Sequence, residues 1–375
     1  MRIAIVSRYA RKGDGQGTAN REITLAALRY GHDVTLFADR VDEDVIAAGA
    51  NWVHISPSIR SNDLAYGLQS VAASSRALKG RQNDFDVIHG YGWTLNGAHH
   101  INTAQFVHSA WMHHAMHPGR VAKGPYALYQ RLYTYVNAKG ERAAFKASKR
   151  VIAASSLIQS ELQTYAQVPA NKINVVLNGA DLNEFYPGYE SRADLKLPES
   201  VFLALFAGDI RTGRKNLDGI LKATKQIPNM HLAVAGRTAG SPWPRLAMEL
   251  GISDRVHFLD FRSDIARLMR AADCFVFPSR YEACALVIVE ALASGLPVVT
   301  ARTTGGAEAV SEDAGIIIED TESTEALVNA LSRMMASKER LADMGIAARG
   351  AAQALGWTSI GALYLQHYQA VAGRL

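Results

Sequence analysis

The chain has 375 residues, of which 48% are hydrophobic and 20% charged, and its formal net charge is +5. This length exceeds one ordinary core, so we expect two domains. No apolar run is long enough for a membrane span, and the N-terminus lacks the apolar core and cleavage site of a signal peptide. The two cysteines, Cys274 and Cys284, have no metal-site spacing and fit a reducing, cytoplasmic compartment.

Strand-like and helix-like runs alternate along the whole chain, which predicts parallel sheets covered by helices on both faces. In the first half we expect strands at 3–7, 34–38, 52–56, 87–89, 101–106, 150–154 and 173–177, and helices at 18–30, 64–79, 126–147 and 157–165. In the second half we expect strands at 202–207, 231–235, 256–261, 274–277, 298–300 and 315–318, and helices at 216–226, 265–271, 286–293, 324–336, 338–354 and from 357 to about 371.

Positive charge is concentrated in the first half, where residues 1–185 carry a net +6 and residues 186–375 a net −1. The excess lies in residues 111–150, which hold eight Lys and Arg against Glu141 alone, with Trp111 and four tyrosines between them. Such a surface could contact an anionic membrane or an anionic acceptor. It could equally be a solvated helix whose long side chains cover apolar surface. Nucleic acid is not expected, since no recognition motif accompanies the charge.

The most informative segment is 277–300, which reads as strand, tight turn, helix, glycine stop and strand. Glu282 precedes the helix, and Glu290 lies inside it within an almost wholly apolar run. A buried carboxylate must be paired or hydrogen-bonded, so we expect Glu290 to have a functional role. The helix N-terminus attracts phosphate, and carboxylates accept hydrogen bonds from vicinal hydroxyls. This combination suits a sugar nucleotide.

The segment also resembles the E-x7-E motif of retaining glycosyltransferases of the GT-B fold, in glycosyltransferase family 4 (glycosyl transferases group 1). The usual form is E-G-F-G-L-x-x-x-E, whereas this chain has Ala283 and Ala285 at the two glycine positions. The resemblance implies two Rossmann-like doubly wound domains facing a cleft. It places an acceptor-side domain at 1–183, a nucleotide-sugar domain at 184–355 and a helix crossing back to the first domain at 356–375. The boundary rests on the N-G-x-D-x-x-x-F-x-P pattern that starts at Asn178.

The resemblance also assigns residues of the second domain to the donor. Arg211 and Lys215 would grip the diphosphate in place of a metal, with Arg214 assisting or replacing Arg211. Glu282 would hold the donor sugar and Glu290 the ribose. We expect further donor contacts from Gly208, Cys284, Ala285 and Leu286. The glycine turn 303–306 and Glu308 could close on the donor, although Glu308 is equally well explained as an acid in the first turn of a helix.

In the first domain, the resemblance points to the first βα loop and to the end of the strand at 101–106. Gly15 and Gly17 match the family's glycine-rich loop in kind, although Gln16 separates them. The family's active-site histidine falls on Gln105, with His108 three residues further on. Either His108 reaches the donor sugar as a catalytic group, or Gln105 takes the hydrogen-bonding role.

We therefore predict a metal-independent, retaining glycosyltransferase without a cofactor. It would move a sugar from a nucleoside diphosphate donor, UDP in preference to GDP or ADP, to a glycan, lipid-linked or small-molecule acceptor. Polysaccharide, lipopolysaccharide or glycolipid synthesis is the expected setting, in the cytoplasm or at the inner face of the membrane. Two alternatives stay open: a sugar-nucleotide epimerase of similar fold, and a non-catalytic sugar-nucleotide-binding subunit. A nicotinamide-dependent dehydrogenase is disfavoured because the dinucleotide fingerprint is incomplete.

Overall fold

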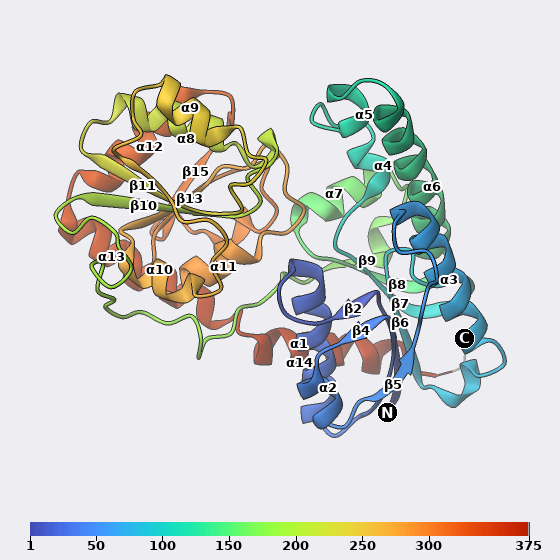
Figure 1. Ribbon diagram of the computed structural model, residues 1–375. Helices are drawn as coiled ribbons and strands as arrows, with labels where there is room; N and C mark the ends of the chain where they lie inside the picture. Colours follow the sequence, from blue (N-terminus) through green and yellow to red (C-terminus); the bar gives the residue numbers. More distant parts are fainter. Residues whose placement is uncertain (374) are drawn as a thin grey trace. The chain divides into compact units, whose positions relative to one another are not determined.

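The computed structural model describes residues 1–373 and 375, and the chain divides into two compact units (Figure 1). The first unit consists of Met1–Asn178 together with Trp357–Leu375, and the second of Gly179–Gly356. Each unit has its own parallel sheet. The predicted pair of doubly wound α/β domains is therefore confirmed.

The first unit is built on a seven-stranded sheet in the order β5-β3-β1-β6-β7-β8-β9. Its strands are β1 (Arg2–Val6), β3 (Asp33–Ala38), β5 (Asn51–His54), β6 (Val87–Tyr91), β7 (His99–Ala104), β8 (Ser148–Ala153) and β9 (Ile173–Val175). A separate parallel pair joins β2 (Tyr9–Ala10) to β4 (Arg40–Val41). The central strands are buried, as expected of strands covered on both faces.

Helices flank this sheet on both sides, with α1 and α14 on one side and α3 and α6 on the other (Figure 1). The helices of the first unit are α1 (Gly15–Arg29), α2 (Glu43–Ala47), α3 (Asp63–Leu78), α4 (His108–Trp111), α5 (Pro118–Val121), α6 (Pro125–Ala147), α7 (Ser156–Thr164) and α14 (Trp357–Val371). The sequence did not predict α2, α4 or α5, because helices of four or five residues are too short to show a periodicity.

The C-terminal helix α14 packs closely against α1 within the first unit. A Cβ added at Gly361 would lie only 2.3 Å from the Ala26 Cβ, so glycine permits this close approach. A buried polar network joins the same helix to the sheet: the His89 ring contacts the Tyr368 hydroxyl at 2.7 Å and the Thr103 hydroxyl at 2.8 Å. Burial lowers the pKa of His89 to about 3, so this ring is neutral near pH 7.

The second unit has a six-stranded parallel sheet in the order β12-β11-β10-β13-β14-β15. Its strands are β10 (Phe202–Ala207), β11 (Met230–Ala235), β12 (Val256–Phe258), β13 (Cys274–Phe277), β14 (Val298–Ala301) and β15 (Gly315–Ile318). The expected strand at 256–261 is wrong in its last residues: β12 ends at Phe258, and Asp260 takes a left-handed conformation with φ 57°.

In the second unit, α8, α9 and α12 cover one face of the sheet, and α10, α11 and α13 cover the other (Figure 1). Their bounds are α8 (Leu217–Gln226), α9 (Trp243–Glu249), α10 (Ile265–Ala271), α11 (Leu286–Ala293), α12 (Thr324–Met335) and α13 (Lys338–Gln353). Ser323 and Ser337 cap α12 and α13 by accepting N–H bonds from the first turn. No helix among residues 1–373 and 375 is long and apolar enough to cross a membrane.

Candidate active site

Three neighbouring strands of the second unit end at the same edge of the sheet and carry the residues predicted for the donor. In the sheet, β13 lies between β10 and β14, and all three run parallel. The loops that follow them, 208–216, 278–285 and 302–306, therefore meet at the carboxyl edge. Ligands of open α/β sheets bind at this edge.

The structure brings two of the predicted cations together with one predicted carboxylate. The Lys215 Nζ lies 2.7 Å from Glu282 Oε2, and an Arg214 guanidinium nitrogen lies 3.7 Å from the same oxygen. The side chains of Lys215 and Glu282 are only 13% and 15% exposed, so this pair is poorly screened by water. Lys215 also stacks its ammonium 4.7 Å from the centre of the Phe277 ring. The aromatic ring and the carboxylate together fix the position of this cation.

Gly208 leaves room for the Lys215 side chain. A Cβ at position 208 would lie 2.9 Å from Lys215 Cδ, so only glycine permits this approach without a shift of the lysine. Arg211, in contrast, is half exposed and its guanidinium pairs with Asp209 at 2.8 Å. The structure thus groups Arg214, and not Arg211, with Lys215 and Glu282.

The turn before α11 presents backbone groups to the same edge. The N–H of Ala285 donates to the Gly305 carbonyl at 2.8 Å, and the N–H of Gly305 donates to the Glu282 carbonyl at 2.6 Å. Ala285 is the N-cap of α11 and has no side-chain oxygen to cap the helix, which begins at Leu286. The Ile288 N–H donates to the Ala285 carbonyl at 3.2 Å, so the first two N–H groups of the helix are the ones without an intrahelical acceptor. Cys284 lies half-buried in this turn.

Glu290 lies one turn further along α11, with part of its surface still accessible. Burial, with a smaller contribution from the Glu184 carboxylate, raises the pKa of Glu290 to about 7. Near neutral pH this group therefore exists in both protonation states. The ionised form can accept hydrogen bonds from vicinal hydroxyls on both oxygens, whereas in the protonated form one oxygen carries an O–H donor.

The predicted residues of the first unit meet around a cavity of about 220 Å³. Gly17, Gln105 and His108 line it, whereas Gly15, the exposed first residue of α1, is not among its lining residues. A Cβ at Gly17 would lie 2.7 Å from the Arg11 carbonyl oxygen, so backbone packing alone explains this glycine. Asp14 caps α1 by accepting from the Gly17 N–H at 2.7 Å.

Sequence reasoning missed the residue that holds His108. The His108 Nδ1 lies 2.6 Å from Glu141 Oε1, and the His108 backbone N–H donates to Glu141 Oε2 at 2.9 Å. Glu141 belongs to α6 and is buried. It occupies the buried face of α6 that also contains Asn137, Ala138 and Ala144. A carboxylate on such a face is a detectable signal, the same one that identified Glu290.

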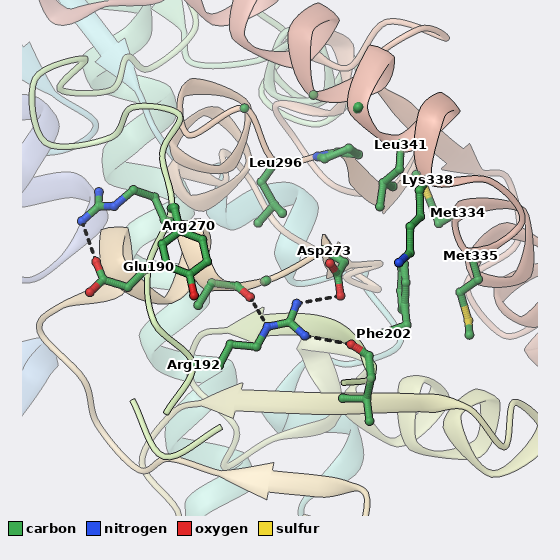
Figure 2. Close-up of a pocket in the computed structure, with 18 of the residues that line it drawn as sticks. Glu190, Arg192, Phe202, Arg270, Asp273, Leu296, Met334, Met335, Lys338 and Leu341 are labelled. Carbon is green, nitrogen blue, oxygen red and sulfur yellow. Dashed lines mark hydrogen bonds and ion pairs between the residues drawn. The ribbon is translucent and has the colours of Figure 1, made fainter. Parts of the chain in front are cut away.

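A groove of about 1410 Å³ lies at the opposite edge of the second unit's sheet (Figure 2). Its walls include Phe202 at the start of β10 and Asp273 just before β13. Figure 2 shows Leu296, Met334 and Leu341 among its lining residues, with Lys338 close to Met334 and Leu341. Arg192, which also lines the groove, donates to Asp273 at 2.8 Å, so these two charges are paired with each other. None of the predicted donor residues lines this groove.

Comparison with known families assigns each half of the chain separately. The family "Glycosyltransferase Family 4" matches residues 13–184, and "Glycosyl transferases group 1" matches residues 189–351. A D-inositol 3-phosphate glycosyltransferase 2 from Catenulispora acidiphila is 30% identical over 301 residues, covering 74% of this chain and 69% of the relative. A D-inositol 3-phosphate glycosyltransferase from Mycobacterium sp. strain JLS is 33% identical over 236 residues. That match covers 59% of this chain and about half of the relative's own length, 52%.

Solved structures share the fold at low sequence identity. A sucrose-phosphate synthase from Thermosynechococcus elongatus has a TM-score of 0.80 at 21% identity, with 98% of both chains covered. The lipopolysaccharide glycosyltransferase WaaG has a TM-score of 0.77 at 21% identity over the full length of both chains. Anabaena Alr3699/HepE, solved with UDP and glucose, has a TM-score of 0.70 at 19% identity and covers 98% of this chain and 99% of its own. In sequence and in the GT-B fold of its two units, the chain belongs to glycosyltransferase family 4.

Proposed function

We propose that the protein is a retaining glycosyltransferase that moves a sugar from a nucleoside diphosphate sugar to an acceptor hydroxyl. The observation that carries this proposal is the group of Lys215, Arg214 and Glu282 at the carboxyl edge of the second sheet, beside the start of α11. Two cations beside a helix N-terminus suit a diphosphate. A carboxylate next to them suits sugar hydroxyls.

In this proposal Lys215 and Arg214 bind the diphosphate and stabilise the negative charge that grows on it as the sugar leaves. They take the part that a divalent cation plays in other transferases, which is why we propose metal independence and no cofactor. Glu282 holds the donor sugar through its hydroxyls, and Glu290 holds the ribose. Arg211, paired with Asp209, has a smaller role than the sequence pattern suggested.

The donor base and the acceptor are proposed from the similar proteins. HepE was solved with UDP and glucose, which supports UDP as the nucleotide. The curated relatives are named for D-inositol 3-phosphate, and WaaG for lipopolysaccharide biosynthesis. We propose an acceptor from glycan, lipopolysaccharide or glycolipid synthesis, and a test panel should include a phosphorylated polyol.

The direct test replaces the lysine of this group. Lys215→Ala should lower the rate of sugar transfer from UDP-glucose at least about a hundredfold, as loss of a preorganised charge partner does. Lys225→Ala, an exposed lysine of α8, is the matched control and should leave the rate unchanged. Full activity of Lys215→Ala would contradict the proposed role. Conversion of the nucleotide sugar without any acceptor would indicate an epimerase, and tight binding without turnover a binding subunit.

We further propose that α6 contacts an anionic membrane surface. Leu128, Leu132 and Tyr135 are 69%, 52% and 46% exposed, and they recur at helical spacing on one face. Exposed Lys139 and Arg142 continue that face. Apolar residues followed by cations suit the interface of a bilayer, where each nearby cation adds about 1 kcal/mol.

Sedimentation with vesicles tests this contact. Binding should require anionic lipid, weaken as salt is added, and fall in Leu132→Ser. Leu68→Ser removes an exposed leucine of α3 and serves as the control. Equal binding to neutral and anionic vesicles, or no binding to either, would contradict a membrane contact and favour a solvated surface.

A further inference from the structure

Glu141 uses both of its carboxylate oxygens on one residue, His108. One oxygen contacts the ring at Nδ1, at 2.6 Å, and the other accepts the backbone N–H, at 2.9 Å. His108 is the first residue of α4, so this second bond satisfies an N–H that the helix itself leaves free. The side chain of Glu141 is 7% exposed and that of His108 is 18% exposed. The carboxylate therefore fixes both the backbone and the ring of His108.

This arrangement determines which ring nitrogen is left for a ligand. A carboxylate accepts, so Nδ1 carries a proton, and in the neutral ring Nε2 is then a hydrogen-bond acceptor. The ring also packs edge-on against the rings of Phe106 and Tyr133, with centroids 4.9 Å and 5.8 Å away. His108 lines the cavity of the first unit, so Nε2 is the group it can offer there.

The rest of that cavity has the composition of a site for a small hydroxylated ring. Within residues 1–373 and 375, the Gln105 Nε2 donor and the Asn20 Oδ1 acceptor are both buried without a hydrogen-bond partner. Both residues line the cavity, as does the aromatic ring of Trp93. A hydroxyl can donate and accept, so one ligand with several hydroxyls could satisfy both orphaned groups. Aromatic faces pack well against the C–H surface of such a ring.

We propose that Glu141 is a positioning residue: it presents His108 Nε2 to a hydroxyl of the ring that the first unit binds in this cavity. The inference rests on the proposed function, since it describes the ligand of the first unit of a glycosyltransferase. To the proposed function it adds the side chains that would bind the hydroxyl groups of this ligand. They are His108, held by Glu141, and the amides of Gln105 and Asn20.

The protonated nitrogen of His108 can be measured in the unmodified protein. Heteronuclear NMR of the imidazole nitrogens should show the proton on Nδ1 in the neutral ring. In Glu141→Gln the amide oxygen can accept the backbone N–H, but its NH₂ then faces Nδ1 and drives the proton to Nε2. A purely structural role of Glu141 would not move this proton. Glu43→Gln, at an exposed position of α2, is the matched control.

Ligand binding is tested with glucose and myo-inositol as probes. Titration of the intact protein should shift the His108 imidazole and Trp93 indole signals. Glu141→Gln should weaken that binding roughly two- to tenfold, as loss of one hydrogen bond does. His108→Gln should weaken it similarly while keeping a partner for Glu141, which guards against a loss that reflects folding alone. Acceptor KM should rise more than kcat falls in both variants.

Three results would overturn this proposal: a proton on Nε2 in the unmodified protein, no signal shift with either probe, or unchanged binding in both variants. UDP binding, measured in parallel, separates this outcome from that of the proposed function. Normal UDP binding with no ring binding would reject only the inference about the first unit. Normal UDP binding and transfer in Lys215→Ala would reject the proposed donor site and leave the NMR result standing.

Discussion

Binding of a nucleotide sugar should strengthen as the pH rises through 7, because Glu290 titrates there. Burial and the nearby Glu184 carboxylate raise the pKa of Glu290 to about 7. Roughly a tenth of the Glu290 carboxyls are then ionised at about pH 6, and roughly nine tenths at about pH 8. If only the ionised form accepts both ribose hydroxyls, the Kd for the donor should fall about tenfold between these two values.

Calorimetric titration with UDP-glucose at about pH 6, 7 and 8 measures this change. UDP-glucose is preferable to UDP because its diphosphate has no terminal phosphate monoester, whose second proton is lost near pH 6. Glu290→Gln should bind more weakly at about pH 8 and lose most of the pH dependence. Glu325→Gln, an exposed position of α12, should behave like the unmodified protein. An equal pH dependence in Glu290→Gln, or a Kd that rises with pH, would refute the assignment of Glu290 to the ribose.

Three further outcomes follow from other contacts. Glu282→Gln should keep UDP affinity within a few-fold but slow sugar transfer roughly tenfold to a hundredfold, since the proposed contact of Glu282 is to the sugar. A loss of UDP affinity as large as the loss of transfer rate, measured by calorimetry, would contradict a contact to the sugar alone. Gly208→Ala should weaken UDP binding without unfolding the protein, because a Cβ at 2.9 Å displaces Lys215 Cδ; unchanged UDP affinity would show that the lysine position is unimportant. Burial lowers the pKa of His89 to about 3, whereas the ordinary pKa of histidine is about 6.5. The contribution of neutral His89 to the free energy of unfolding is therefore complete above about pH 6.5. It is lost as the pH falls towards about 3, by up to roughly 5 kcal/mol. Urea unfolding at about pH 7 and about pH 4.5 should show this loss, and His89→Gln should reduce it; identical pH dependence in that variant would exclude His89 as the cause.

The sequence predicts the fold well because its strands are apolar runs between polar loops. In the second unit β10, β13 and β15 begin and end at the expected residues. The loops at their carboxyl ends follow from parallel pairing, so a shared edge for Lys215 and Glu282 could be expected. The identity of the arginine beside Glu282 could not be predicted, because it depends on which carboxylate each arginine of one loop pairs with. Asp209 captures Arg211, which leaves Arg214 beside Lys215.

Contacts between distant segments are the part that the sequence did not reveal. His108 and Glu141 are 33 residues apart, and His89 and Tyr368 are 279 apart. No local pattern links such residues, since their pairing depends on how α6 and α14 pack on the sheet. In the sequence, Glu141 was notable only as the single acidic residue within the basic segment 111–150. Several histidines precede Glu141 in the sequence, and any of them could have been the active-site residue. Only the structure shows that His99 is fully buried whereas His108 is half-buried.

The two carboxylate pairs differ in what they leave available to a ligand, and this difference fits their proposed roles. An unpaired charge with so little exposure would cost several kcal/mol, so each group needs a partner before any ligand arrives. Lys215 has three donors and gives one to Glu282, so it can bind a phosphate oxygen without breaking the pair. Both oxygens of Glu141 contact His108, one at the ring and one at the backbone N–H, so this carboxylate holds His108 in place at the cavity that both residues line. The proposed role of Lys215 is therefore to bind a ligand directly, whereas the proposed role of Glu141 is to hold His108 in place.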